Sequence, residues 1–320
     1  MEFTRELLHN RHRLSHQQIN TWFGEQQNQL VFEEKLHQLN HLSKFLEIVD
    51  VFIKKDIWFL PLKGPMLSYR IYGDATCRIS RDFDFLIKQE DVEATITLFR
   101  NLGFKYAPGR WHENGTGNNH IASMVNQLTL FHPDTKIIIE IHWRVFIDPI
   151  INFDEIEKLV RQNIQQFEFV GKKMNQFTIE FELLYLIIHG GLHTWRRLKW
   201  LVDVHEIINR YQIDPIKFER LTQQFGAQRM VGACNALLRH FFASSQILPV
   251  DYPVPEWFQQ YAIWQAEREE DYPDKRLANL FKLRLYYIQA FPSSMYKKKR
   301  IHILFSSLKK IGHSFPIIFF

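Results

Sequence analysis

The chain has 320 residues, of which 46% are hydrophobic and 23% charged, and its formal net charge is +5. This length and composition can fill a core in each of two domains, and the small positive excess is compatible with nucleotide or nucleic-acid partners. Cys77 and Cys234 are the only cysteines, which excludes a disulfide framework and a four-cysteine zinc site.

Residues 1 to 54 are predicted to be helical and to pack against the sheet that follows. Apolar residues recur there at near-helical spacing, with Gln, Asn and His between them: Leu30, Val31, Leu36, Leu39, Leu42, Phe45, Leu46, Ile48 and Val49. The first 30 residues are polar and lack the apolar stretch of a signal peptide. No apolar run approaches the length of a membrane span, so we expect a cytoplasmic protein without a transmembrane segment.

Residues 56–65 form an apolar strand that runs into a Lys63-Gly64-Pro65 turn. Residues 66–73 then read as a short helix, with Pro65 suited to its first turn and Gly73 to its end. A turn of this kind offers backbone N–H groups and a helix N-terminus to phosphate groups.

The stretch Arg78–Ile87 is rich in Phe and Ile and carries two acids, Asp82 and Asp84. Successive side chains of a strand point to opposite faces, so both carboxylates project on one side, roughly 7 Å apart. Two such acids can share divalent cations. Asp-x-Asp is nevertheless a short motif, and acids of this kind are common as solvated residues.

After this strand we expect a helix over residues 90–102, strands at 104–106, 120–125 and 128–132, and a loop over 108–119. In the loop, Trp111 and His112 either stack on a base or anchor the loop by burying apolar area.

A third strand, Ile137–Trp143, carries a single acid, Glu140. Glu140 and His142 share one face of it, and the apolar residues share the other. A third carboxylate on a neighbouring strand would complete a site for hard cations and phosphate chemistry. His142 either orients that site or contacts phosphate, or it is a structural histidine.

Beyond residue 150 a helix over 153–163, a hairpin over 167–174 and then mainly helices are expected. The later helices are expected over residues 215–225, 229–244, 255–270 and 275–291.

His189 and His193 have the spacing of metal ligands on a helix, but two glycines and the lack of an intervening Glu argue against a zinc site. The segment Trp195–Trp200 is basic and aromatic, which suits phosphate contact and base stacking.

The C-terminal stretch combines the basic cluster 297–300, an amphipathic helix over 301–310 and an apolar end over 315–320. Such a combination can rest on an anionic membrane surface. Docking of the helix on the protein itself is the competing interpretation.

Five segments together resemble one family: Leu62–Pro65, Arg78–Leu86, Glu140–Trp143, Glu182–His189 and Leu198–Asp203. They are similar to the poorly characterised bacterial nucleotidyltransferase family of the DNA polymerase beta-like superfamily, over residues 35 to 210. The resemblance implies a small mixed-sheet catalytic core with three metal-binding carboxylates, followed by helices.

By the same resemblance, Asp82 and Asp84 match the paired acids, Glu140 matches the third, and Lys199 lies in a segment that faces the catalytic cleft. One departure concerns the turn, where the superfamily usually has Gly or Ser after the glycine. Pro65 stands there instead and has no N–H to donate. Phosphate contact would then fall to Lys63, Arg78 or Ser80, the last two on the Asp82 face if the strand begins that early.

We therefore predict an α+β protein with an N-terminal helical segment (1–54), a mixed-sheet nucleotidyltransferase core (55–150) and a mainly helical C-terminal domain (151–320). The predicted reaction moves a nucleoside monophosphate from an NTP, with ATP as the expected donor, to a hydroxyl acceptor, using Mg²⁺ or Mn²⁺. Catalysis and metal binding are assigned to Asp82, Asp84 and Glu140, and nucleotide binding to Lys63, Gly64, Arg78, Ser80, His142 and Lys199.

The acceptor is open among protein, RNA, sugar and small molecule. Two alternatives remain: a glycosyl transfer that uses Asp-x-Asp to hold a nucleotide sugar, and an inactive, antitoxin-like or regulatory binding module. The absence of a long doubly wound sheet before the motif counts against the first. The three acids count against the second, although the substituted turn keeps it open.

Overall fold

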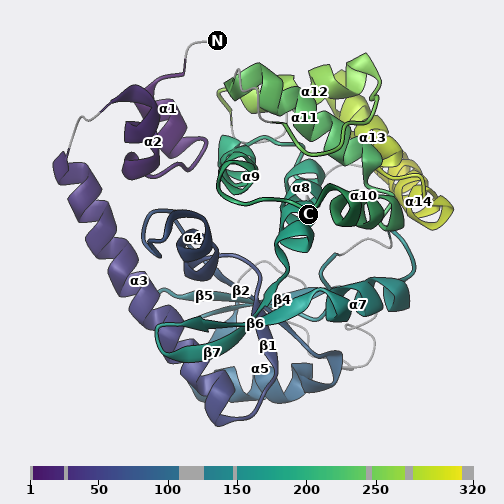
Figure 1. Cartoon of the computed structure of the whole chain (residues 1–320). Coiled ribbons are helices and arrows are strands. Elements are labelled where there is room, and N and C mark those ends of the chain that lie inside the picture. Colours follow the sequence, from purple (N-terminus) through teal and green to yellow (C-terminus); the bar gives the residue numbers. More distant parts are fainter. Residues whose placement is uncertain are drawn as a thin grey trace. The chain divides into compact units, whose positions relative to one another are not determined.

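The structure is a computed structural model of this chain. It describes residues 3–24, 28–107, 126–146, 150–242, 247–270 and 277–311. The predicted strand at 120–125, the loop residues Trp111 and His112, and the apolar end at 315–320 lie outside the described residues. The chain is α+β, as predicted, with a five-stranded mixed sheet, a two-stranded hairpin and many helices (Figure 1).

The chain divides into two compact units, each described by itself. The sheet unit comprises residues 2–147 and 157–178, and the helical unit comprises residues 148–156 and 179–320. Helix α3 (Asn28–Lys54) and the hairpin of residues 164–177 both contribute apolar side chains to the core of the sheet unit.

Three helices precede the sheet, in agreement with the predicted helical segment: α1 (Arg5–Asn10), α2 (His16–Phe23) and α3 (Asn28–Lys54). Thr4 caps the first, and Ser15 forms a capping box with Gln18 at the start of the second. These side chains accept backbone N–H groups that a helix start leaves without a partner.

The sheet has the strand order β1-β2-β5-β4-β3. Its elements are, in chain order, β1 (Phe59–Pro61), α4 (Pro65–Tyr72), β2 (Phe83–Ile87), a 3₁₀ turn (Gln89–Asp91), α5 (Val92–Asn101), β3 (Lys105–Tyr106), β4 (Gln127–Phe131) and β5 (Ile138–His142). The pair β2–β5 is parallel and the other pairs are antiparallel. The sheet is therefore mixed, as predicted.

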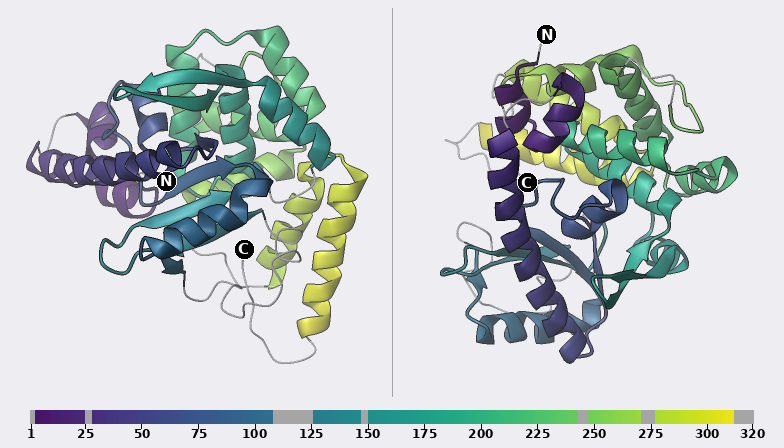
Figure 2. Two further views of the ribbon diagram at one scale, coloured as in Figure 1. Left: turned by 90° about the horizontal axis from the view of Figure 1, so that it is seen from below. Right: turned by 60° about the vertical axis from the view of Figure 1, so that its left-hand side comes forward.

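One face of this sheet is apolar and is covered by α3 and α5, which Figures 1 and 2 show alongside it. Phe85 of β2 is fully buried there, and its ring lies 5.6 Å from the ring of Phe45, 5.0 Å from that of Phe52 and 6.0 Å from that of Phe59. Aromatic rings bury large apolar areas and favour such offset and edge contacts. Since strand residues alternate between faces, the packing of Phe85 turns Asp84 to the opposite face.

A hairpin completes the sheet unit after α7 (Phe153–Gln162): β6 (Ile164–Phe169) pairs with β7 (Lys172–Phe177). Its turn residues, Val170 and Gly171, both have positive φ, as tight hairpin turns require. The hairpin is longer than the predicted 167–174 but turns at Gly171 as expected. The side-chain amide of Asn175 donates to the carbonyl of Phe59 at 2.8 Å and so ties β7 to β1.

The helical unit continues the predicted series of helices. These are α8 (Ile179–Leu192), α9 (Leu198–Arg210), α10 (Pro215–Gln224), α11 (Gln228–Phe242), α12 (Glu256–Glu267), α13 (Leu277–Ala290) and α14 (Ser294–Ile311). Helix α8 is buried almost throughout. A Cβ at Gly190 would lie 2.4 Å from the Trp195 ring, and one at Gly191 would lie 2.4 Å from Met230 Sδ, so both glycines permit close packing.

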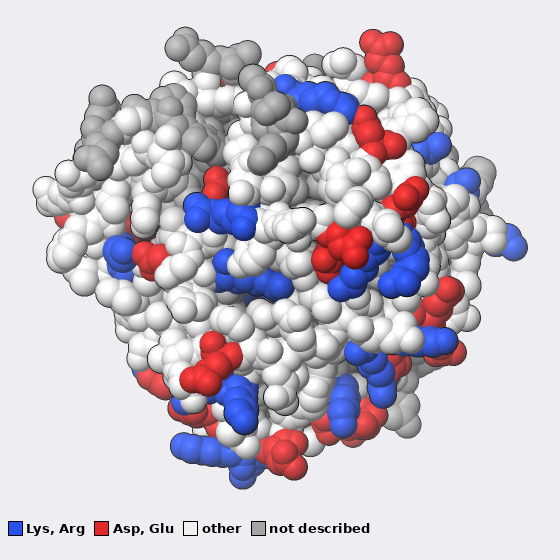
Figure 3. All heavy atoms as spheres, viewed as in Figure 1, with Lys and Arg blue, Asp and Glu red and all other residues white. Residues whose placement is uncertain are grey.

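The surface shows no single-sign area on the face drawn in Figure 3, where basic side chains lie among acidic ones. None of the helices in the described parts of the chain combines the length and apolar character needed to cross a bilayer.

Candidate active site

Two of the predicted acids stand side by side on the face of the sheet opposite the aromatic core. In the parallel pair β2–β5, Asp84 is in register with Glu140. Neighbouring strands lie about 4.8 Å apart, so the two carboxylates project next to each other. Asp84 is 5% exposed. Two buried like charges at this spacing need positive partners.

Two basic side chains supply those partners. His142, two residues after Glu140 on the same face, places Nε2 3.2 Å from Oδ1 of Asp84 and 3.7 Å from Oε2 of Glu140. Lys63 places Nζ 3.3 Å from Oδ2 of Asp84. The backbone N–H of Leu62 donates to the carbonyl of Asp84 at 3.0 Å, which fixes the turn that carries Lys63 beside the acid.

Two polar residues of β4 hold Glu140 from its other side. Gln127 Nε2 donates to Oε2 at 2.9 Å, and the Thr129 hydroxyl lies 3.3 Å from Oε1. Sequence reasoning missed both. The sequence pattern that could have indicated them is the alternation of Gln127 and Thr129 with apolar residues, which places both on the polar face of one strand. In the structure they are in register with His142 and Glu140, respectively.

Burial and charge act against each other on the titratable groups here. Burial by itself raises the pKa of Glu140, and Asp84 adds to this, but the contact with His142 and the charges of His142 and Lys63 outweigh them and lower it. Burial by itself lowers the pKa of His142, whereas Asp84 and Glu140 more than reverse this and raise it. The buried group therefore favours two carboxylates balanced by an ammonium and an imidazolium.

This balance leaves one polar atom without compensation. His142 Nδ1 is buried and has no hydrogen-bond partner among the described residues. A charged imidazolium would carry an N–H at that atom, and a buried donor without an acceptor costs about 1–3 kcal/mol. The carboxylates of Asp84 and Glu140 and the imidazole of His142 together form a group that could hold a metal ion.

We expect His142 to titrate above its ordinary pKa of about 6.5 in metal-free protein, and Mg²⁺ to lower that pKa by competing for the same carboxylates. Because the folded-state pKa is raised, its contribution to stability is complete below the unfolded-state value and is lost as pH rises through the folded-state value. NMR titration of the His142 ring protons, with and without Mg²⁺, measures both shifts.

Asp84→Asn should lower the pKa of His142, because it removes the carboxylate that contacts Nε2 at the shorter distance and leaves Glu140 as the remaining acid. The exposed His302 serves as the reference resonance. A His142 that titrates at or below its ordinary value in unmodified, metal-free protein would contradict this electrostatic picture.

Asp82 lies just before β2 and is half-buried. In the described parts of the chain, the ligand atoms of Asp84, Glu140 and His142 all lie within 4.8 Å of one another, and Asp82 is outside that group. The parallel register of β2 and β5 explains this. His142 lies two residues after Glu140, whereas Asp82 lies two residues before Asp84. His142 and Asp82 therefore lie on opposite sides of the acid pair along the strand direction.

Arg78 and Ser80 would share a strand face with Asp82 only if the strand began that early, and this condition is not met because β2 starts at Phe83. The preceding residues bond to helices instead. The Arg78 N–H donates to the Ser68 hydroxyl at 3.0 Å, and the Ser80 N–H donates to Oε1 of Gln38 at 3.2 Å. Both residues are buried. Because neither lies in β2, alternation along that strand does not place them on the face of the acids, and it gives no support to their predicted contact with phosphate.

The turn before α4 brings Gly64 and Ser80 together. Gly64 has φ 77° and ψ −147°, a conformation that is essentially restricted to glycine. A Cβ at this position would lie 3.5 Å from the Ser80 hydroxyl oxygen. Pro65 occupies the first position of α4, and no side chain caps the start of this helix. The predicted phosphate-binding residues Lys63, Gly64 and Ser80 are therefore close neighbours.

Lys199 belongs to the helical unit, in the first turn of α9, and is half-buried. Next to it Trp200 stacks on His193, with ring centroids 4.8 Å apart, and the guanidinium groups of Arg196 and Arg197 lie 5.9 and 5.8 Å from the Trp200 ring. The basic and aromatic segment predicted from sequence thus forms a cluster within this unit.

The histidine pair that precedes this cluster does not lie on one helix, because α8 ends at Leu192. His189 and His193 contact each other edge to face, with ring centroids 4.6 Å apart.

No curated protein matches the chain. A crystal structure of an antigenic nucleotidyltransferase-like protein from Paracoccidioides brasiliensis aligns with 65% of this chain and 88% of its own, at 15% identity and a TM-score of 0.34. The family model described as "uncharacterised nucleotidyltransferase" matches residues 7–243, which is well over half of the chain. The chain therefore belongs to this nucleotidyltransferase family, as predicted from its motifs.

Proposed function

We propose that this protein is a metal-dependent nucleotidyltransferase. It would transfer a nucleoside monophosphate from an NTP to a hydroxyl acceptor and release pyrophosphate. Family membership supports the reaction class. The observation that carries the proposal is the in-register pair Asp84–Glu140, buried on one face of the sheet beside Lys63 and His142.

The residues present fit a hard divalent cation such as Mg²⁺ or Mn²⁺. Carboxylate oxygens are the ligands these ions prefer, and Asp84 and Glu140 direct theirs into one small volume. We assign Asp82, which directly precedes β2, as the third acid. When bound, the cations neutralise phosphate charge and stabilise the departing pyrophosphate.

The remaining roles follow from position. Glu140, whose carboxylate is held by Gln127 and Thr129, is the candidate base that accepts the proton of the attacking hydroxyl. Lys63 and the Gly64 turn are positioned to bind phosphate oxygens, with the uncapped start of α4 contributing backbone N–H groups. Arg78, Ser80, His142 and Lys199 are proposed as further nucleotide contacts.

The test is transfer of label from ATP and the other triphosphates, with Mg²⁺ or Mn²⁺ and a cell lysate as the acceptor pool of protein, RNA, sugar and small molecules. Label in the α-phosphate should move to an acceptor, and label in the γ-phosphate should leave as pyrophosphate. Transfer of γ-label would assign a kinase reaction instead. Metal-dependent nucleotide binding without any transfer would favour the inactive binding module.

A further inference from the structure

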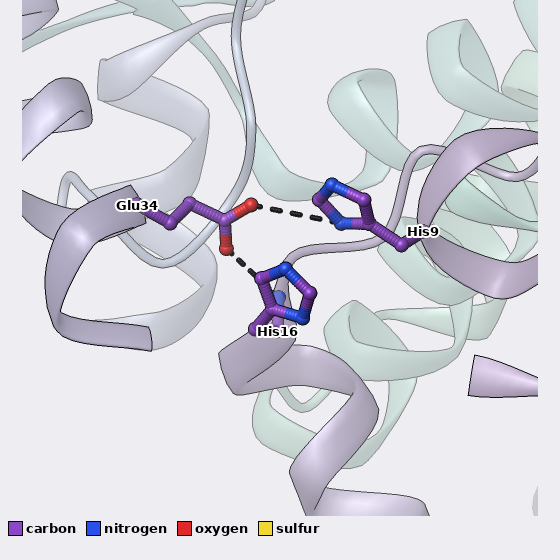
Figure 4. Close-up of side chains that lie close together, drawn as sticks. All are labelled: His9, His16 and Glu34. Atoms are coloured by element: carbon purple, nitrogen blue, oxygen red, sulfur yellow. Dashed lines mark hydrogen bonds and ion pairs between the residues drawn. The ribbon is translucent and has the colours of Figure 1, made fainter. Parts of the chain in front are cut away.

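A second cluster of potential metal ligands lies far along the chain from the acid pair, within the N-terminal helices of the sheet unit. It combines His9 near the end of α1, His16 at the start of α2 and Glu34 in α3. Figure 4 shows the Glu34 carboxylate facing both histidines. One ligand atom from each of the three residues lies within 4.8 Å of the other two.

The two oxygens of Glu34 have different partners. Oε2 accepts the backbone N–H of His16 at 2.8 Å, which holds the start of α2, and Oε1 lies 3.7 Å from Nδ1 of His9. The Glu34 side chain is 14% exposed and the His9 side chain 29% exposed. The cluster is thus sheltered but reachable by an ion and by water.

The two imidazoles of the cluster lie against each other. Their rings stack with centroids 4.2 Å apart and an interplanar angle of 14°. His9 Nδ1 lies 3.0 Å from the carbonyl oxygen of Leu14. A carbonyl only accepts, so Nδ1 carries a proton there, and in a neutral ring Nε2 keeps the lone pair that can bind a metal.

We propose that His9, His16 and Glu34 form a binding site for Zn²⁺. Two imidazoles and one carboxylate are a donor set used by zinc, which takes a water or a further side chain as its fourth ligand. His37, one helical turn after Glu34, is the candidate fourth side chain. The bond from Nδ1 of His9 to a backbone carbonyl is the outer contact that commonly orients a zinc-binding imidazole.

Binding requires one local change. Parallel stacked rings direct their lone pairs side by side and not at one point, so at least one ring must turn about χ2, a torsion with a broad range. The Glu34 cap of α2 need not break, because Oε1 is the oxygen nearer His9.

A zinc ion here would connect the three N-terminal helices α1, α2 and α3. Helices α1 and α2 have 6 and 8 residues, too short to be stable alone. Two polar contacts join the N-terminal helices to the end of α4. Gln18 Nε2 of α2 donates to the Tyr72 hydroxyl at 2.7 Å, and Lys35 Nζ of α3 pairs with Asp74, just after α4, at 2.6 Å. The site would therefore stabilise the support of α4.

The experiment uses the whole chain without an affinity tag, in an Asp84→Asn/Glu140→Gln background that removes the acid pair as a competing site. Zn²⁺ binding is measured by competition with a chromophoric chelator, and Co²⁺ is used as a spectroscopic probe of coordination. His9→Gln and His16→Gln each remove one ligand. Glu34→Gln removes the charge but keeps an oxygen that can accept the His16 N–H. The matched control is His302→Gln, at an exposed position on α14.

We expect one Zn²⁺ per chain in the background protein and in His302→Gln, and loss of that binding in all three site variants. Zn²⁺ should also raise the thermal midpoint of the background protein and leave that of Glu34→Gln unchanged. Equal Zn²⁺ binding by the site variants and the control, or no Zn²⁺ binding by folded background protein, would overturn the proposal. Either result is independent of whether the acid pair catalyses nucleotidyl transfer.

Discussion

Asp84→Asn is expected to reduce the rate of nucleotidyl transfer by about 10³-fold or more. Metal-bound carboxylates contribute several kcal/mol to stabilising the charge of the transition state, and each 1.36 kcal/mol is a factor of ten in rate. Asn keeps the size of the side chain and an oxygen near His142 Nε2, so folding should survive. Rates of transfer from α-labelled ATP, with circular dichroism as the folding check, measure the effect.

Glu90→Gln provides the matched control, because this acid is exposed and lies on the short turn after β2. It should leave the rate unchanged. Asp82→Asn should also lower the rate if Asp82 is a metal ligand, and a normal rate in this variant would remove Asp82 from the proposed site. Retention of activity by Asp84→Asn within about threefold would show that the acid pair is not catalytic.

The second large effect concerns stability. Phe85→Ala should lower the free energy of unfolding of the sheet unit by about 3–5 kcal/mol, the range for removing a fully buried Phe. The Phe85 ring is surrounded by those of Phe45, Phe52 and Phe59, so the surrounding structure has little freedom to refill the cavity. Urea unfolding followed by circular dichroism provides the measurement.

Phe32→Ala is the control for this prediction. Phe32 is also in the sheet unit, on α3, but its side chain is 62% exposed. Surface substitutions of this type usually change stability by less than about 0.5 kcal/mol. If Phe85→Ala cost no more than Phe32→Ala, the aromatic contacts between α3 and β2 would not be the core of this unit.

The alternation of residues within strands was sufficient to predict the two faces of β2 and β5. Asp84 and Glu140 project away from Phe85 and Ile141 because the side-chain period of a strand is two, and this can be read without knowing the fold. The pairing of Asp84 with Glu140 could not be read in the same way. It depends on the parallel register of two strands far apart in the chain, which tertiary packing determines.

The errors of sequence reasoning have a similar origin. The stretch from Arg78 to Ser80 has the composition of a strand, but its backbone groups bond to Ser68 and Gln38 instead of a sheet neighbour. Gln127 and Thr129 have ordinary polar side chains, and only the antiparallel pairing of β4 with β5 places them on Glu140. Long-range partners decided both cases, and neither is encoded in local periodicity.

The path of the chain through its two units has a consequence for biosynthesis. The sheet unit ends at residue 147 but resumes at residue 157 and closes only at residue 178. During translation, the hydrogen bond from the Asn175 amide to the Phe59 carbonyl can form only after β7 has left the ribosome. A polypeptide released at residue 150 would lack Phe169 and Met174 of the shared core. The core of the sheet unit should thus be completed only when the hairpin has been synthesised.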